Sequence, residues 1–337
     1  MSQASPTPPS VLPDDALPPV QPPSAGFLVQ LFVIPGLIVL VMVLVWMLIK
    51  WLPQMGNDAE TNVKALEGSG ANRWQAAVNL ANLLRGDSGG ELKRDRELAA
   101  RLADKLKQEL ADGHTSEDSV LLRVYLATAL GEFYVDTGLP ALVQAIETEE
   151  RTDLKPSLRT AATRAVAVLS SNLRRETGRA ITDPDAVAAV IEASRTDDSL
   201  LRTTAAFALG EMGGDAAQRR LRTLLDDVAH PYARYNAATA LARQGEPAVV
   251  DVLVELLTTQ EPPETSEKDT ADEQAAQRTR LVIHGLQAAS ELAAANSKLE
   301  LRSVVAVVEG LTTDESRAVR EHAKAVLKQL QRRTDAA

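Results

Sequence analysis

The chain has 337 residues, a net charge of -10 at pH 7 and only 3% aromatic residues. It contains no cysteine, which excludes disulfide frameworks and cysteine-ligated metal sites. No basic stripe of the kind found in nucleic-acid-binding proteins is apparent along the sequence, so we expect no nucleic-acid partner.

Residues 1–26 form a proline-rich segment with eight prolines, two acidic residues and no lysine or arginine. Such a segment buries too little apolar surface to offset the loss of chain entropy on folding, so we predict a disordered tail. It could serve as a spacer or as a ligand for proline-binding modules.

An apolar segment follows, and its 22 residues from 28 to 49 include no charged side chain. A helix of this length extends roughly 33 Å, enough to cross a hydrocarbon core of about 30 Å. We predict a transmembrane helix over residues 27–51, with Phe27, Trp46 and Trp51 at the membrane interface. A cleaved signal peptide would need a basic start, a shorter apolar core and a small-residue cleavage site, which are missing.

Lysines near this segment predict its orientation. No lysine or arginine precedes it, whereas Lys50 and Lys64 follow it. The positive-inside tendency then places the large C-terminal part in the cytoplasm. Residues 52–57 would be a short linker.

A short phrase, an arginine followed by small residues, recurs seven times after this segment. Alanine predominates three residues after the arginine and leucine seven residues after it, and both positions lie on one helix face. The mean spacing of about 41 residues matches the period of a two-helix HEAT repeat. The arginines, which we predict to occupy a structural repeat position, are Arg73, Arg123, Arg159, Arg202, Arg234, Arg280 and Arg320.

A second apolar helix follows most copies of the phrase. We therefore predict an all-α fold, a right-handed α-solenoid of stacked antiparallel helix pairs with about seven repeats over residues 58–334, and a tail at 335–337. Asp198 can cap a helix start and Pro231 suits a first helical turn. The predicted second helices are 92–111, 139–147, 186–194, 216–225, 247–258 and 299–311.

Two segments depart from the repeat. Residues 260–274 contain six acidic residues and one lysine, which predicts a solvated loop or, alternatively, a docking site for a basic partner. The Arg280 copy has His284 and Gln287 where small and apolar residues are expected, so its register could be shifted.

The recurring arginines allow two interpretations. Each could bond the turn aspartate of its own or a neighbouring repeat, which would stabilise the stack. Alternatively, they could form a ladder that contacts an acidic or phosphorylated partner. Their regular recurrence favours the structural interpretation.

Residues 197–225 and 221–245 resemble HEAT-like repeats of the phycobilisome-lyase type, and the looser copies extend this resemblance over residues 58–334. The resemblance implies an α-solenoid. Because phycobilin lyases use similar repeats, it also implies a lyase or chaperone-like enzyme as one alternative. The overall layout is similar to that of bacterial proteins, which suggests the bacterial inner membrane.

Residues that could perform chemistry are sparse. The four histidines, His114, His230, His284 and His322, lack the spacing of metal-binding motifs. HEAT-like metalloenzymes similar to deoxyhypusine hydroxylase carry His-Glu dipeptides, and this sequence has none. No nucleophile motif or phosphate-binding loop occurs either. We therefore expect no enzyme activity, no catalytic, cofactor-binding or metal site, and no small-molecule substrate.

These features together predict a membrane-anchored, single-pass scaffold that binds an unidentified protein without catalysis. Two alternatives remain: the lyase or chaperone-like enzyme, and a structural membrane protein that associates with itself.

Overall fold

The computed structural model describes residues 26, 34–51, 58–68, 72–86, 89–149, 156–263 and 269–336. They fall into two compact units, Met1–Asp58 and Ala59–Ala337. In the first unit, helix α2 spans Ile34–Trp51, and its apolar side chains from Leu37 to Met47 are exposed.

The predicted membrane span is only partly covered. Residues 27–33, including Phe27, lie outside the described residues, as do the linker residues 52–57 and nearly all of the predicted tail. Trp46 is an exposed residue of α2, and Trp51 ends this helix. Across the described ranges, none of the helices combines the length and apolar character that crossing a bilayer requires. The span therefore stays a prediction.

The second unit is all-α throughout its described residues, as predicted. Its helices are α3 (Ala59–Glu67), α4 (Arg73–Arg85), α5 (Arg96–Asp112), α6 (Glu117–Gly131), α7 (Leu139–Glu147), α8 (Leu158–Thr177), α9 (Pro184–Ala193), α10 (Ser199–Glu211), α11 (Asp215–Leu224), α12 (Pro231–Ala242), α13 (Val250–Thr258), α14 (Ala271–Ala295), α15 (Arg302–Leu311) and α16 (Arg317–Ala336).

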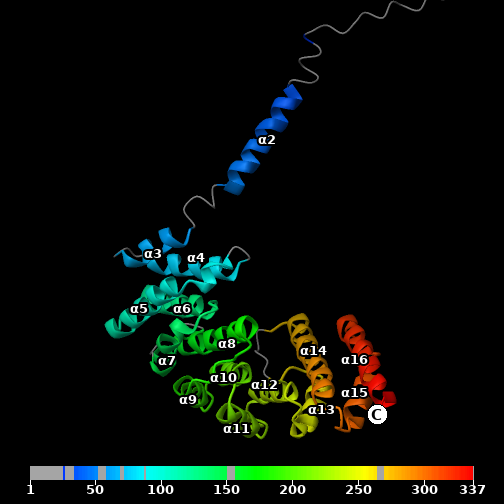
Figure 1. Cartoon of the computed structure of the whole chain (residues 1–337). Helices are drawn as coiled ribbons and strands as arrows, with labels where there is room; N and C mark the ends of the chain where they lie inside the picture. The colour runs from blue at the N-terminus through cyan, green and yellow to red at the C-terminus, as the bar shows by residue number, and fades with distance from the viewer. Residues whose placement is uncertain are drawn as a thin grey trace, which may run out of the picture. The chain divides into compact units, whose positions relative to one another are not determined.

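These helices stack as pairs in two layers (Figure 1). The first layer holds the helices that carry the repeated phrase, α4, α6, α8, α10, α12, α14 and α16, each packed against the next. The second layer holds the remaining helices from α5 to α15, and it lies on the outer side of the curved stack (Figure 1). The prediction of stacked helix pairs in a HEAT- or armadillo-like repeat fold is therefore confirmed.

Small residues let neighbouring first-layer helices approach closely. At Gly131 of α6, an added Cβ would lie 2.8 Å from the Cα atom of Ala165 in α8. At Gly210 of α10, it would lie 2.6 Å from the Cβ atom of Ala240 in α12. Both distances are shorter than van der Waals contact, so these two interfaces require glycine.

Capping residues set helix boundaries that differ from several predictions. The predicted helix 92–111 is interrupted because Asp95 accepts hydrogen bonds from the backbone of Glu97 and Leu98 and starts α5. The predicted acidic loop 260–274 ends early because Thr270 and Glu273 form a capping box that starts α14. Residues 264–268 of that loop lie outside the described residues.

Two other helices also begin at residues that differ from the predicted ones. The second helix predicted from residue 299 begins at Arg302, and a 3-10 turn at Pro247–Val249 precedes α13. Two predicted starts are confirmed: Asp198 caps α10 by accepting from the backbone of Leu201, and Pro231 is the first residue of α12.

Gly131→Ala should destabilise the second unit by about 1–3 kcal/mol, because the new methyl group collides with the backbone of α8. Gly310→Ala is the matched control, since Gly310 lies in α15 with nothing within 4 Å of the added Cβ. This control should be neutral or stabilise by up to about 1 kcal/mol through helix propensity. Urea unfolding followed by circular dichroism measures both changes, and equal effects would contradict the close approach of α6 and α8.

Candidate functional site

Five of the seven repeat arginines bind backbone carbonyls at or just after the end of the preceding second-layer helix. Nε of Arg159 donates to the Ile146 carbonyl at 2.9 Å, and Nε of Arg234 donates to the Leu225 carbonyl at 2.7 Å. The last carbonyls of a helix have no partner within the helix, so such donors satisfy acceptors that would otherwise need water. Arg123 and Arg320 likewise donate to backbone carbonyls of the turn that precedes their own helix.

Several of these arginines also bind a carboxylate on or just after the following second-layer helix. Arg73 contacts Glu109 at 2.6 Å, and Arg234 contacts Glu255. A guanidinium group offers five N–H donors in a fixed plane, so one side chain can join both neighbours. At Arg202 and Arg234, these contacts tie the first-layer helix to the second-layer helices before and after it.

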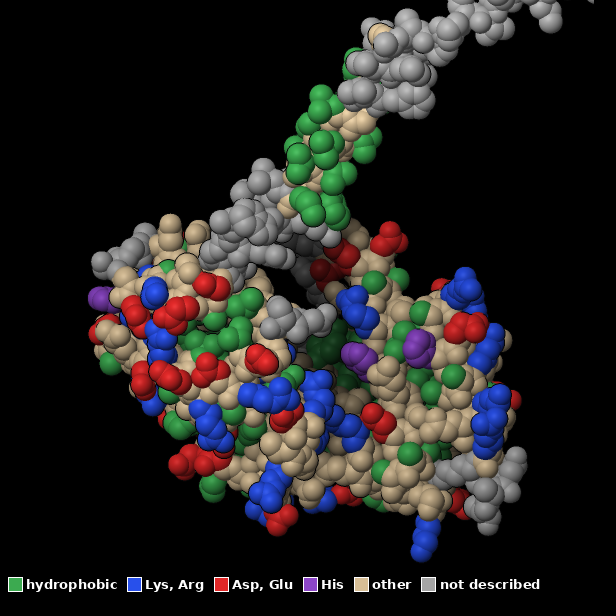
Figure 2. All heavy atoms as spheres, turned by 45° about the horizontal axis from the view of Figure 1, so that its top comes forward, with side chains coloured by type: hydrophobic (Ala, Val, Ile, Leu, Met, Phe, Trp, Pro, Cys, Tyr) green, Lys and Arg blue, Asp and Glu red, His purple; other side chains and the backbone are tan. Residues whose placement is uncertain are grey.

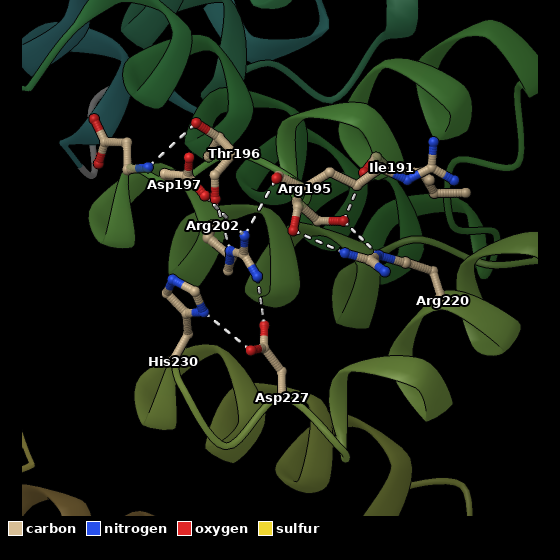
Figure 3. Close-up of polar contacts among 10 residues, drawn as sticks. Ile191, Arg195, Thr196, Asp197, Arg202, Arg220, Asp227 and His230 are labelled. Carbon is tan, nitrogen blue, oxygen red and sulfur yellow. Dashed lines mark hydrogen bonds and ion pairs between the residues drawn. The ribbon is translucent and has the colours of Figure 1, made fainter.

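The contacts of Arg202 are drawn in Figure 3. Its guanidinium donates to the carbonyls of Thr196 and Arg195 at 2.7 and 3.2 Å, and to Asp227 at 2.7 Å. His230 contacts the other Asp227 oxygen at 2.9 Å. Partial burial opposes ionisation of Asp227, but the hydrogen bonds with His230 and Arg202 outweigh it and hold the pKa of Asp227 below its usual value.

Arg220 completes this cluster from α11. It donates to the hydroxyl and the carbonyl of Ser194 at 2.7 and 2.9 Å, at the end of α9. Burial lowers the pKa of Arg220, and the positive charges of Arg195 and Arg202 lower it further. The donors of the cluster thus point at protein carbonyls, a hydroxyl and a carboxylate.

In the sixth copy of the phrase, the equivalent contacts belong to Arg278. Nε of Arg278 donates to the Thr259 carbonyl at 3.1 Å, and its terminal nitrogens bind both oxygens of Asp314 at 3.2 and 2.6 Å. The hydrogen bonds to Asp314 raise the pKa of Arg278. Arg280 is exposed, so the predicted repeat position at Arg280 was wrong by two residues.

Arg278→Ala should destabilise the protein by roughly 1–3 kcal/mol, because it leaves the carboxylate of Asp314 without its main partner. Arg202→Ala should act in the same direction through Asp227. Arg280→Ala removes an arginine from the same helix and should change stability by no more than about 0.5 kcal/mol. Thermal unfolding of the three variants measures this order, and a larger effect at Arg280 would contradict the corrected register.

One stripe of the first layer remains open. In α10, Leu200 and Phe207 are each 42% exposed and lie seven residues apart, on the same helix face. Since α8 and α12 flank α10 and α9 and α11 cover its outer side, this stripe faces the inner side of the stack. The space-filling view shows a hollow on this side, with basic, acidic and histidine side chains around it (Figure 2).

A buried carboxylate lies in the same stripe. Glu211, at the end of α10, is only 6% exposed, and its carboxylate is bound by Arg174 from α8 and by Arg243 from α12. Arg243 also donates to the Gly210 carbonyl at 3.1 Å, and the hydroxyl of Ser170 donates to the Glu211 carbonyl at 2.7 Å. Two cations therefore neutralise one buried anion and join three adjacent first-layer helices.

A cavity of about 240 Å³ opens on this inner face between α10, α12 and α14. It combines aromatic rings with polar groups, and its lining includes Phe207, Tyr235, Thr239, Arg243, His284 and Glu291. A larger hollow of about 1120 Å³ is lined by α14 and by Glu261 and Pro262, close in sequence to the undescribed residues 264–268.

This inner stripe was not predicted from the sequence. Phe207 and, on α8, Arg164 both stand five residues after their repeat arginine, whereas the predicted helix face rested on the positions three and seven residues after it. The copies of the phrase do carry a signal, because the fifth position holds valine, threonine, arginine, phenylalanine, isoleucine or alanine when the sixth copy is counted from Arg278. Such variation is typical of an uncovered position.

The histidines lie apart from one another along the chain. His230 contacts Asp227, His322 contacts the Ala318 carbonyl, and His284 lines the inner cavity. Within the part of the chain that the structure describes, no three histidine, aspartate or glutamate side chains form a group that could hold a metal ion.

Comparisons with known proteins agree with this fold. Residues 187–267 match the family of HEAT repeats. No curated protein sequence matches the chain.

Among solved structures, an engineered protein of the Northeast Structural Genomics Consortium is 21% identical with a TM-score of 0.38, covering 82% of this chain and 97% of its own. A designed armadillo repeat protein is 15% identical with a TM-score of 0.38, covering 81% of this chain and 100% of its own. Human deoxyhypusine hydroxylase is 18% identical with a TM-score of 0.32, covering 83% of this chain and 99% of its own. The family match thus identifies HEAT repeats over residues 187–267.

Proposed function

We propose that this chain is a non-catalytic scaffold that binds a protein partner on the inner face of its HEAT-like repeats and is anchored to a membrane by its N-terminal apolar segment. The observation that carries the binding function is the exposed stripe of Leu200 and Phe207 beside the inner cavity. Exposed apolar side chains next to a cavity and polar groups are typical of protein-binding surfaces.

The distribution of polar contacts supports binding in preference to catalysis. The repeat arginines donate to carbonyls and carboxylates of the protein itself, as at Arg202 and Arg278. Glu211 is bound by two arginines, so it is poorly suited to act as a base. A curved stack of helix pairs also offers an extended surface, which suits a long segment of a partner.

The support for membrane anchoring comes from composition. The segment 28–49 has no charged residue, and its described part in α2 exposes apolar side chains from Leu37 to Met47. Lys50 and Lys64 after the segment favour a cytoplasmic repeat domain. The proposed membrane is the bacterial inner membrane, which a single segment of the chain would cross.

Phe207→Glu should abolish partner binding, because it places a charge in the apolar stripe. Ala188→Glu is the matched control, since Ala188 is an exposed residue of α9 in the outer layer. Chemical crosslinking in cells, affinity capture and quantitative mass spectrometry should recover the same proteins with the wild type and with Ala188→Glu, and lose them with Phe207→Glu. Equal recovery with all three would refute binding at the inner face.

Membrane anchoring is tested separately by two deletions. The full chain and a chain lacking residues 1–26 should both remain in the membrane pellet after alkaline carbonate extraction, because both keep the apolar segment. A chain lacking residues 1–53 should move to the supernatant. If the full chain is extracted as well, the anchor does not exist. In intact cells, digestion of residues 54–337 by external protease would contradict the cytoplasmic placement.

A further inference from the structure

The inner faces of α8, α10 and α12 carry an excess of positive charge. On α8, Arg164 and Arg175 are both exposed, and their spacing of eleven residues places them on one helix face. Apart from a hydrogen bond from Arg175 to Asn172, these two guanidinium groups make no hydrogen bond or ion pair within the described residues. We call Arg164, Arg175, Leu200, Phe207 and Arg243 the inner strip.

The carboxylates of this region cancel that charge only in part, although the exposed Glu291 of α14 lines the cavity. Glu211 is already shared between Arg174 and Arg243, and Glu176 at the end of α8 binds Arg94 at 2.7 Å. The inner strip is therefore a local cationic surface on a chain whose net charge is -10. Its position differs from that of the repeat arginines, whose guanidinium groups bind carbonyls at the helix ends.

The cavity beside the inner strip has room for one side chain. Its volume of about 240 Å³ is below the range of roughly 300–1,000 Å³ typical of pockets for small-molecule ligands. Phe207 and Tyr235 supply aromatic surface, and Arg243 stands at the cavity with its side chain 36% exposed. A single aromatic or large aliphatic side chain is the usual anchor in such a recess.

We propose that the inner strip binds an acidic peptide segment whose carboxylates contact Arg164, Arg175 and Arg243, and whose central aromatic or large aliphatic side chain enters the cavity beside Phe207. This assignment rests on the proposed function, since it names the chemistry of the partner at the same face. Charge complementarity selects the acidic segment, and the cavity selects the apolar anchor.

The test is selection of random 12-residue peptides on the full chain in detergent micelles, followed by fluorescence anisotropy of the selected peptides. We expect a consensus with several aspartate or glutamate residues around an aromatic or large aliphatic residue, and affinity that falls as salt is raised. Arg164→Glu combined with Arg175→Glu should weaken binding at least about tenfold. Arg219→Glu, which reverses an exposed arginine of α11 in the outer layer, should leave binding unchanged.

The anchor is tested by a double-mutant cycle. Phe207→Ala should weaken the selected peptide about tenfold, but should have little further effect on a peptide whose anchor residue is alanine. A basic or uncharged consensus, the absence of any consensus, or unchanged affinity in the double arginine variant would overturn the proposal. Binding of a single-stranded oligonucleotide as tight as that of the acidic peptide would overturn it too, because the surface would then recognise polyanions in general.

Different results would refute the scaffold function and the acidic-peptide assignment. If Phe207→Glu removes a cellular partner while selection yields a basic consensus, the scaffold function stands and the acidic-peptide assignment fails. If Phe207→Glu leaves the captured proteins unchanged, the inner face is not the binding surface and both fail.

Discussion

Close contact between neighbouring first-layer helices is the constraint on which the rest of this structure depends. Gly131 and Gly210 stand where a methyl group would collide with the next helix, and buried alanines line the same interfaces. Helices that approach so closely on one side, and carry a second layer on the other, stack into a curved array (Figure 1). The curvature leaves the inner side open, so small buried residues indirectly create the surface available to a partner.

The same constraint explains the use of the arginines. Each helix is packed between its neighbours, so the carbonyls at its end have little contact with water. These carbonyls have no partner within the helix and need other donors. Arg159, Arg202 and Arg234 supply them. The arginines at the repeat position thus join the helix pairs, whereas Arg164 on the inner face makes no such contact within the described residues.

The helices were predictable because their apolar and small residues recur at helical spacing, a signal that is local and repeated. The exact starts of the helices were less predictable, because single capping side chains decide them. Asp95 begins a helix within the predicted helix 92–111, and Thr270 begins one within the predicted loop 260–274. Arg278 and Arg280 lie two residues apart, and the positions of the Thr259 carbonyl and of Asp314 distinguish them. The inner face could not be identified from one helix, because exposure of Phe207 depends on which sides α8, α9, α11 and α12 cover.

The cavity between α12 and α14 has a consequence for how the array unfolds. In a stack of repeats, each interface adds its own free energy, so cooperativity is transmitted only through neighbours. The α10–α12 interface is closed by glycine against alanine, whereas a cavity opens between α12 and α14 beside α10. Because α12 packs more extensively on α10 than on α14, the interface between α12 and α14 should transmit less of the cooperativity of unfolding.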